Sequence, residues 1–156
     1  ASYITLKMVS NFSHKQAEKY QPVVDRYAKQ YSISSRLIYA VIRTESNFNP
    51  FAVSPIPAYG LMQLVPTSGG RDAYCHVNGT DGVPSKQYLF DPDKNIELGA
   101  AYLDLLDDSY LSKVQNDISR EYCVISAYNT GAGNVLRTFS KTRDAAFNII
   151  NGLQPP

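Results

Sequence analysis

The sequence has 156 residues, of which 44% are hydrophobic and 19% charged, and 15 Lys and Arg against 14 Asp and Glu give a formal net charge of +1. A chain of this length is sufficient for one domain with a single buried core. The balanced charge argues against electrostatic binding of nucleic acid, and no apolar stretch approaches the length of a membrane span.

Residues 1–10, ASYITLKMVS, carry Ile4, Leu6 and Met8 at alternate positions, which is the period of a strand. One strand cannot bury itself. We therefore interpret residues 1–10 as the extended tail of a preceding domain.

A helix is predicted to begin at residues 11–13, because Ser13 followed by Gln16 has the form of a capping box. Pro22 lies inside its pattern and predicts either a kink or the start of a second helix. The residues that mark the buried side of this helix recur at helical spacing: Ala17, Tyr20, Val24, Tyr27 and Tyr31.

The next predicted helix begins after Ser34, a residue type typical of helix N-caps. Its apolar stripe consists of Leu37, Ile38, Val41 and Ile42. Glu45 continues this stripe, and a carboxyl group held against apolar side chains has the raised pKa that a general acid needs near neutral pH. The alternative is a rim residue whose carboxylate reaches water. Pro50 disfavours helix at the residue before it, so the helix should end just after Glu45 and present it to a cleft.

Proline and glycine shape the segments that follow. AVSPIP should be extended, and residues 58–64 are predicted to form a short buried helix that ends before Pro66. Gly60 inside so short a helix suggests a close approach of backbone or ligand. Residues 69–88 contain four glycines and are predicted to form a short helical turn followed by a surface loop.

The C-terminal half has the clearest helix signals. Asp91 is a cap and Pro92 stands at the first helical position of a helix with one apolar side, made by Ile96, Gly99, Leu103, Leu106 and Tyr110. Another helix is predicted from Asp117 or Ser119, with inward side chains of Tyr122, Val124, Ile125 and Tyr128. Two more helices are predicted over 134–139 and 143–150, with Gly152 as a C-cap. No strand alternation follows residue 10, so the predicted class is all-α.

Cysteine and histidine usage does not predict a metal site. Cys75 and Cys123 could pair in an oxidising compartment, but two distant cysteines favour free thiols. His14 and His76 show no ligand spacing with either cysteine, except that His76 adjoins Cys75. We expect no metal and no cofactor.

Three segments in order, ESNFNPFAVS, AYGLMQLVP and SAYNTGAGNV, resemble the motifs of the lytic transglycosylases of the soluble, goose-lysozyme-like group. The resemblance begins near Phe12 and implies a catalytic domain over residues 11–156. The segments SGGRDAY, PSKQYLFDPDKNI and VLRTFS resemble a membrane-bound subgroup. The implied fold is all-α and lysozyme-like, with Glu45 on a central buried helix. Pro57 departs from the family, where most relatives have Gly in the turn.

The resemblance also implies the chemistry. Members cleave the β-1,4 bond between N-acetylmuramic acid and N-acetylglucosamine without water and leave a 1,6-anhydromuramoyl product. Glu45 would act as general acid and then as base. The positions that match substrate-binding residues of the family are Ser54, Met62, Gln63, Tyr102, Tyr128 and Asn129. From residue type alone, Ser54 is typical of a turn, Met62 and Tyr128 of a core, and Asn129 of a helix C-cap.

The partner that the resemblance implies is a peptidoglycan glycan strand. It implies a monomeric periplasmic domain, part of an outer-membrane lipoprotein, with no direct membrane contact of its own and no nucleic acid. Relatives continue with a final helix that carries another tyrosine, so we expect the C-terminal end of the domain to be truncated. Two alternatives stay open: a goose-type lysozyme that hydrolyses the same bond, and a catalytically weak glycan-binding module.

Overall fold

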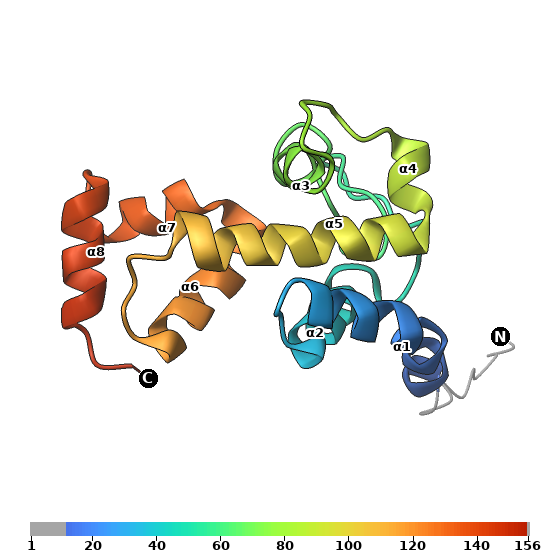
Figure 1. Cartoon of the computed structure of the whole chain (residues 1–156), viewed down its shortest axis with the longest axis horizontal. Helices are drawn as coiled ribbons and strands as arrows, with labels where there is room; N and C mark the ends of the chain where they lie inside the picture. Colours follow the sequence, from blue (N-terminus) through green and yellow to red (C-terminus); the bar gives the residue numbers. More distant parts are fainter. Residues whose placement is uncertain (1–11, 156) are drawn as a thin grey trace, which may run out of the picture.

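The computed structural model describes residues 12–155. Within this range the chain is mostly helical, and its only β-structure consists of isolated bridges from Tyr59 to Val53 and to Leu64, which confirms the all-α class. The tail predicted for residues 1–10 lies outside the described residues. In chain order (Figure 1), the elements are α1 (Phe12–Gln30), α2 (Ser35–Ser46), α3 (Gly69–Asn78), α4 (Lys86–Phe90), α5 (Pro92–Asp104), the π-helix η1 (Leu105–Tyr110), α6 (Asp117–Thr130), α7 (Ala132–Phe139) and α8 (Arg143–Gly152).

Helix α5 runs through the middle of the molecule. Figure 1 shows α3 and α4 on one side of it and α1 and α2 on the other, with α6, α7 and α8 gathered around its C-terminal end. Eight of its residues are buried. Helix α2, which carries Glu45, packs against α1 and α5 and buries Ile38 and Ile42 completely. The interior is therefore built mainly on α5, with the Glu45 helix packed on its flank.

The N-terminal helix follows the predicted pattern with two corrections. Tyr20, Val24 and Tyr27 are buried, as predicted. However, α1 continues without a break through Pro22, so no second helix begins there. The proline is exposed, where water can satisfy the carbonyl that loses its backbone partner. The helix already includes Ser13, which is therefore not its N-cap.

The segment predicted as a short helix over residues 58–64 is a tight turn instead. Tyr59 and Leu64 exchange backbone hydrogen bonds of 3.0 and 3.2 Å across it. Gly60 and Gln63 have φ angles of +80° and +48°, in the left-handed region that a right-handed helix cannot contain. The helix prediction was therefore wrong. We call residues 59–64 the clamp turn.

Residues 69–88 are more ordered than predicted. They form the ten-residue helix α3 and then, after a loop, the short helix α4. The short-turn prediction was wrong because the glycines lie at the ends of α3: Gly79 is its C-cap, and Gly70 and Gly69 stand in its first turn, where Gly69 serves packing. A Cβ placed there would lie 2.9 Å from the ring of Tyr102.

The C-terminal helices form where predicted, with differences in detail. The side chain of Asn116 accepts a hydrogen bond from the backbone of Ser119, so α6 begins at Asp117. Tyr122 and Ile125 were predicted to face inward but are 56% and 42% exposed. The residues that α6 buries are Cys123, Val124 and Ala127.

Two predicted helix caps differ from the structure in detail. Gly152 is the last helical residue of α8 and not its C-cap, which is Leu153. Ser34 occupies the N-cap position of α2 but makes no capping side-chain bond. Cys75 and Cys123 are free thiols, as predicted.

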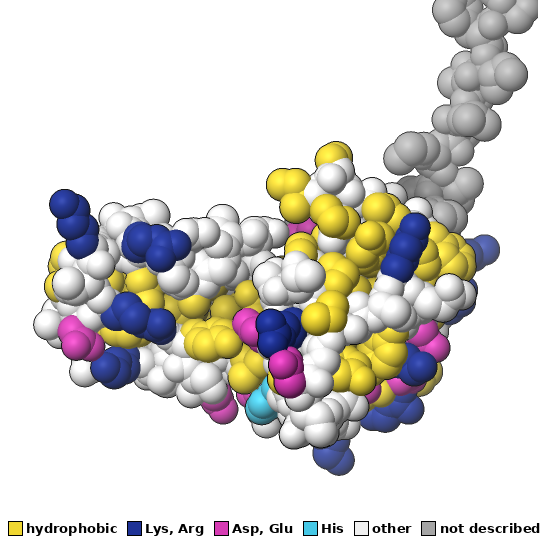
Figure 2. Space-filling view, turned by 90° about the horizontal axis from the view of Figure 1, so that it is seen from above, with side chains coloured by type: hydrophobic (Ala, Val, Ile, Leu, Met, Phe, Trp, Pro, Cys, Tyr) yellow, Lys and Arg dark blue, Asp and Glu magenta, His cyan; other side chains and the backbone are white. Residues whose placement is uncertain are grey.

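No helix within residues 12–155 is long and apolar enough to cross a bilayer. Figure 2 shows hydrophobic side chains gathered over the half of the molecule that holds α3 and α4, while Lys and Arg are scattered over this face.

The cap of α5 gives a first testable prediction. The carboxylate of Asp91 accepts hydrogen bonds from the backbones of Asp93 and Lys94, at 3.0 and 3.2 Å. Asp91→Ala should therefore lower the free energy of unfolding by about 1 kcal/mol. Urea denaturation measures this, with the exposed Glu121→Ala as a control that should change stability by less than about 0.5 kcal/mol. An equal loss in both variants would contradict the capping role.

Candidate active site

Glu45 stands at the C-terminal end of α2, one residue before the helix ends. Asn47 adopts a left-handed conformation (φ 47°), donates its N–H to the carbonyl of Arg43, and so turns the chain away. The side chain of Glu45 is half-buried, and this burial raises the pKa of its carboxyl group. The raised pKa agrees with the effect predicted for an acid on the apolar stripe.

Two tyrosines lie together beside this helix end. The hydroxyl of Tyr128, on α6, donates a hydrogen bond of 2.8 Å to the carbonyl of Met62. Burial raises the pKa of Tyr128 well above its usual range, and the nearby charge of Glu45 raises it further. The ring of Tyr102, on α5, lies 5.5 Å from that of Tyr128, and burial raises its pKa to about 12. Both phenols therefore stay protonated at neutral pH. The Tyr102 hydroxyl can donate a hydrogen bond, whereas that of Tyr128, whose proton goes to Met62, can still accept one.

The clamp turn places the other predicted site residues. Met62 is completely buried. The side-chain amide of Gln63 donates to the carbonyls of Ala52 and Gly60, at 3.0 and 2.9 Å, so both of its hydrogens are used within the protein. Its side-chain oxygen remains as an acceptor for a ligand.

Ser54 lies in the extended segment before the clamp turn. Its hydroxyl donates to the carbonyl of Ile56 and accepts from the backbone N–H of Ala58 at 3.1 Å. This is the geometry of a turn residue, the alternative that residue type alone favours.

A pocket of about 190 Å³ brings most of the predicted residues together. It is lined by Gln63, Leu64, Val65, Ser68, Gly69, Tyr102, Tyr128, Asn129, Thr130 and Gly131. Four predicted residues, Gln63, Tyr102, Tyr128 and Asn129, thus share one hollow. Ser54 and Met62 do not line it. Glu45 also stands outside its lining, adjacent to it through Tyr128.

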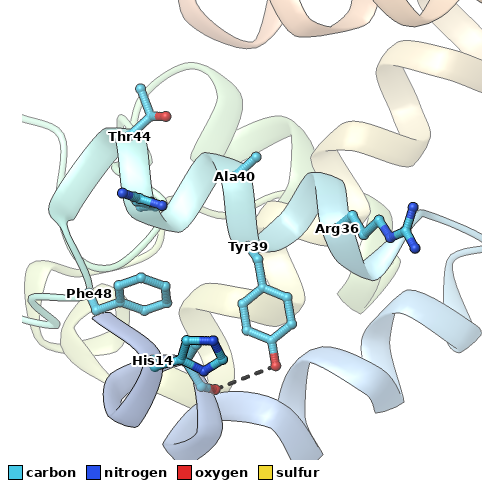
Figure 3. Close-up of a pocket in the computed structure, with 8 residues that line it drawn as sticks. His14, Arg36, Tyr39, Ala40, Thr44 and Phe48 are labelled. Atoms are coloured by element: carbon cyan, nitrogen blue, oxygen red, sulfur yellow. Dashed lines mark hydrogen bonds between the residues drawn. The ribbon is translucent and has the colours of Figure 1, made fainter. Parts of the chain in front are cut away.

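A larger hollow, of about 490 Å³, lies between α1 and α2 (Figure 3). It is lined by His14, Ala17, Arg36, Tyr39, Ala40, Arg43, Thr44 and Phe48. The lining residues that belong to α2 occupy its side opposite to Ile38, Ile42 and Glu45. In Figure 3, Arg36 points away from His14 and Phe48, so its guanidinium does not converge with them on one ligand position. Size alone therefore does not mark the candidate active site.

Two polar residues at the site were missed by sequence reasoning. Ser46 donates its hydroxyl to the carbonyl of Leu61, at 2.7 Å, and Asn95 accepts from the backbone N–H of Met62, at 2.8 Å. The available signal for Asn95 was its spacing on α5, four residues before Gly99 and seven before Tyr102, on the face that meets the clamp turn.

The family model described as "Transglycosylase SLT domain" matches residues 22–151. The chain belongs to this family. The SLT domain is 49% identical over 152 residues to the membrane-bound lytic murein transglycosylase C of Pectobacterium atrosepticum and 50% identical to that of Sodalis glossinidius. Each match covers 97% of this chain and 42% of the relative, so the chain spans less than half the length of these relatives. The predicted family and its membrane-bound subgroup are confirmed.

Solved structures confirm the fold of the SLT domain. An inactive mutant of the lytic transglycosylase Slt from Pseudomonas aeruginosa matches with a TM-score of 0.62 and 33% identity, over 84% of this chain and 20% of that one. The 70 kDa soluble lytic transglycosylase of Escherichia coli matches with a TM-score of 0.61 and 29% identity, over 86% of this chain and 21% of that one.

Proposed function

We propose that this SLT domain cleaves the β-1,4 bond between N-acetylmuramic acid and N-acetylglucosamine in peptidoglycan, and that it leaves a 1,6-anhydro ring instead of adding water. The observation that carries the proposal is Glu45: a half-buried carboxyl group with a raised pKa, at the end of a helix and beside the protonated Tyr128. Relatives named lytic murein transglycosylases support the substrate class.

A single acid is sufficient for this reaction. Glu45, protonated, donates its proton to the glycosidic oxygen as the bond to the muramic acid C1 breaks. The C6 hydroxyl of the same sugar then bonds to C1, and the Glu45 carboxylate takes the hydroxyl proton. Two-carboxylate glycosidases instead use a second acid as nucleophile or to activate water. Here the substrate supplies the nucleophile, so no second acid is required.

The other site residues have supporting roles in this proposal. Tyr102, Tyr128, Gln63 and Asn129 form the pocket wall against which a sugar would bind, with phenol and amide groups for its hydroxyl and acetamido substituents. Ser54 and Met62 hold the neighbouring backbone. We further propose that the domain acts as a monomer in the periplasm, as part of an outer-membrane lipoprotein, in agreement with the membrane-bound naming of its relatives.

The pH dependence of kcat follows from the raised pKa of Glu45. The acid must be protonated when the substrate is bound, so kcat should fall as the pH rises through this pKa. Because burial raises the pKa, the fall should lie at higher pH than the value of about 4.3 for an unperturbed Glu. Initial rates of product release between pH 4 and 8 measure it. A midpoint at or below the ordinary Glu value would contradict the role of Glu45.

Product analysis tests the proposal itself. Purified peptidoglycan is digested with the domain, and the muropeptides are analysed by mass. Anhydromuropeptides, one water lighter than hydrolysis products, are expected. Reducing ends would instead indicate a goose-type lysozyme. Retained binding to peptidoglycan without any product would indicate a glycan-binding module.

A further inference from the structure

One peptide group of the clamp turn is held from two sides. The carbonyl of Leu61 accepts the hydroxyl of Ser46, at 2.7 Å, and the N–H of Met62 donates to the side-chain oxygen of Asn95, at 2.8 Å. Ser46 is the last residue of α2 and directly follows Glu45, whereas Asn95 lies on α5. The Leu61–Met62 peptide group is therefore a bridge between the end of the Glu45 helix and the central helix.

The side-chain amide of Asn95 is hydrogen-bonded through both its nitrogen and its oxygen. Its nitrogen donates to the carbonyls of Tyr59 and Leu89, at 2.9 and 2.8 Å, while its oxygen accepts from Met62. Among the described residues Asn95 is the one buried polar side chain, with 0% exposure. Because an unpaired buried donor or acceptor is costly, these three bonds fix both the position and the orientation of the amide.

The packing around the clamp turn leaves it little freedom. A Cβ on Gly60 would lie 2.4 Å from the Asn95 nitrogen, so the turn lies directly against the amide. The sulfur of Met62 lies 2.1 Å from the position of a Cβ on Gly99, one helical turn after Asn95. The carbonyl of Met62 accepts the hydroxyl of Tyr128. Met62 is thus held through its N–H, its side chain and its carbonyl.

We propose that Asn95 is a positioning residue for the reaction. Through the Leu61–Met62 peptide group it fixes the helix end that presents Glu45 and, through the Met62 carbonyl, the hydroxyl of Tyr128. Asn95 itself touches no substrate. The inference rests on the proposed function, because it assigns Asn95 to the same site.

A purely structural role makes a different prediction. If Asn95 only stabilised the fold, its replacement would lower stability and leave the folded enzyme with normal kcat. A positioning role lowers kcat in folded protein much more than it raises KM, because Tyr102 and Asn129 of the sugar-binding wall lie outside the clamp turn. Misplacement of a catalytic group by about 1 Å can cost on the order of 10²-fold in rate.

The main experiment compares Asn95→Ser and Asn95→Asp with wild type on a soluble peptidoglycan fragment, below the unfolding temperature of each protein. Serine removes the amide without adding charge. Aspartate keeps the shape and an acceptor but loses both donors. We expect kcat to fall about 10- to 100-fold in each, with KM within about threefold. Ile150 is buried in α8, outside the clamp turn and the pocket wall. Ile150→Ala is therefore the control for lost stability and should keep normal kcat.

A double-mutant cycle tests the path through the peptide group. Ser46→Ala removes the other side of the bridge, so it should also lower kcat. If both residues act through the Leu61–Met62 peptide group, their effects should not be independent. The fold-decrease in kcat of the Ser46→Ala, Asn95→Ser double variant should then be smaller than the product of the two single fold-decreases. Independent, multiplying losses would contradict the path.

A second readout does not need activity. The pKa of the Glu45 carboxyl can be followed by carbon NMR in wild type and in Asn95→Ser. We expect the pKa of Glu45 to move toward the ordinary Glu value in the variant, because the loosened helix end admits water. Tyr128, on α6, is the titratable group that faces Glu45.

Unchanged kcat with an unchanged pKa would overturn the inference. Failure of both Asn95 variants to fold would also overturn it, because it would assign Asn95 a structural role. If wild type makes no anhydro product, the proposed function fails, while the NMR comparison still tests the positioning.

Discussion

Replacing Glu45 by glutamine is expected to lower kcat for glycan cleavage by about 10²- to 10⁴-fold, the range that a general acid or base contributes. Glutamine has nearly the same shape but can neither donate the proton to the glycosidic oxygen nor accept one from the C6 hydroxyl. The rate of anhydromuropeptide release measures the effect. Binding to peptidoglycan should persist, because the pocket wall of Tyr102 and Tyr128 is unchanged.

Glu97→Gln is the matched control for this variant. Glu97 is also half-buried, and burial and the neighbouring Asp93 raise its pKa, but it lies on α5 near Tyr27 of α1 and does not line the pocket of Tyr102 and Tyr128. We expect its replacement to change kcat by less than about twofold. Equal losses in both variants, or normal activity of Glu45→Gln, would remove Glu45 from the mechanism.

The stability of Glu45→Gln separates lost chemistry from lost folding. The folded-state pKa of Glu45 is raised above its unfolded value, so its favourable contribution is present at low pH and is lost as the pH rises through the folded pKa. At neutral pH the charged, half-buried carboxylate therefore disfavours the folded state. The glutamine variant should be at least as stable as wild type at pH 7, so its inactivity would not reflect unfolding.

Gly60→Ala is expected to give the largest loss of stability, at least about 3 kcal/mol. Alanine at φ +80° is strained, and its Cβ would lie 2.2 Å from the carbonyl oxygen of Leu89, a backbone atom that cannot easily move. Because the clamp turn also holds the ends of α2 and α6, activity should fall in the fraction that still folds. Urea denaturation and product release measure the two effects.

Gly133→Ala, in α7, is the control. There a Cβ would meet nothing closer than the flexible Arg137 side chain, at 3.5 Å, and the residue is helical. Alanine should therefore leave stability unchanged or raise it by up to about 1 kcal/mol. A similar loss at both glycines would mean that the clamp turn is not under special steric constraint.

The elements that the sequence alone determined are those whose signals are local. Asp91 and Pro92 mark the start of α5 because a cap and its two backbone partners lie within three residues. The apolar period of residues 37–45 predicted both α2 and the raised pKa of Glu45, since one helical face follows from spacing alone. The ordered motifs located Gln63, Tyr128 and Asn129, and the wider family resemblance added Tyr102; the structure brings all four to one pocket.

Only the tertiary structure decided the shape of the clamp turn and what holds it. The local sequence of the clamp turn predicts a short buried helix. In the folded chain, however, Gly60 and Gln63 adopt left-handed conformations, and Gly60 packs against Leu89 and Asn95. Asn95 is 33 residues from Met62 in the sequence, so no local pattern could report their hydrogen bond. The inward face of α6 was misjudged for a similar reason, because its neighbours α7 and η1 determine which of its faces is buried. Local spacing specifies where helices begin and which face is apolar, whereas pairing across the core depends on groups that meet only when the chain has folded.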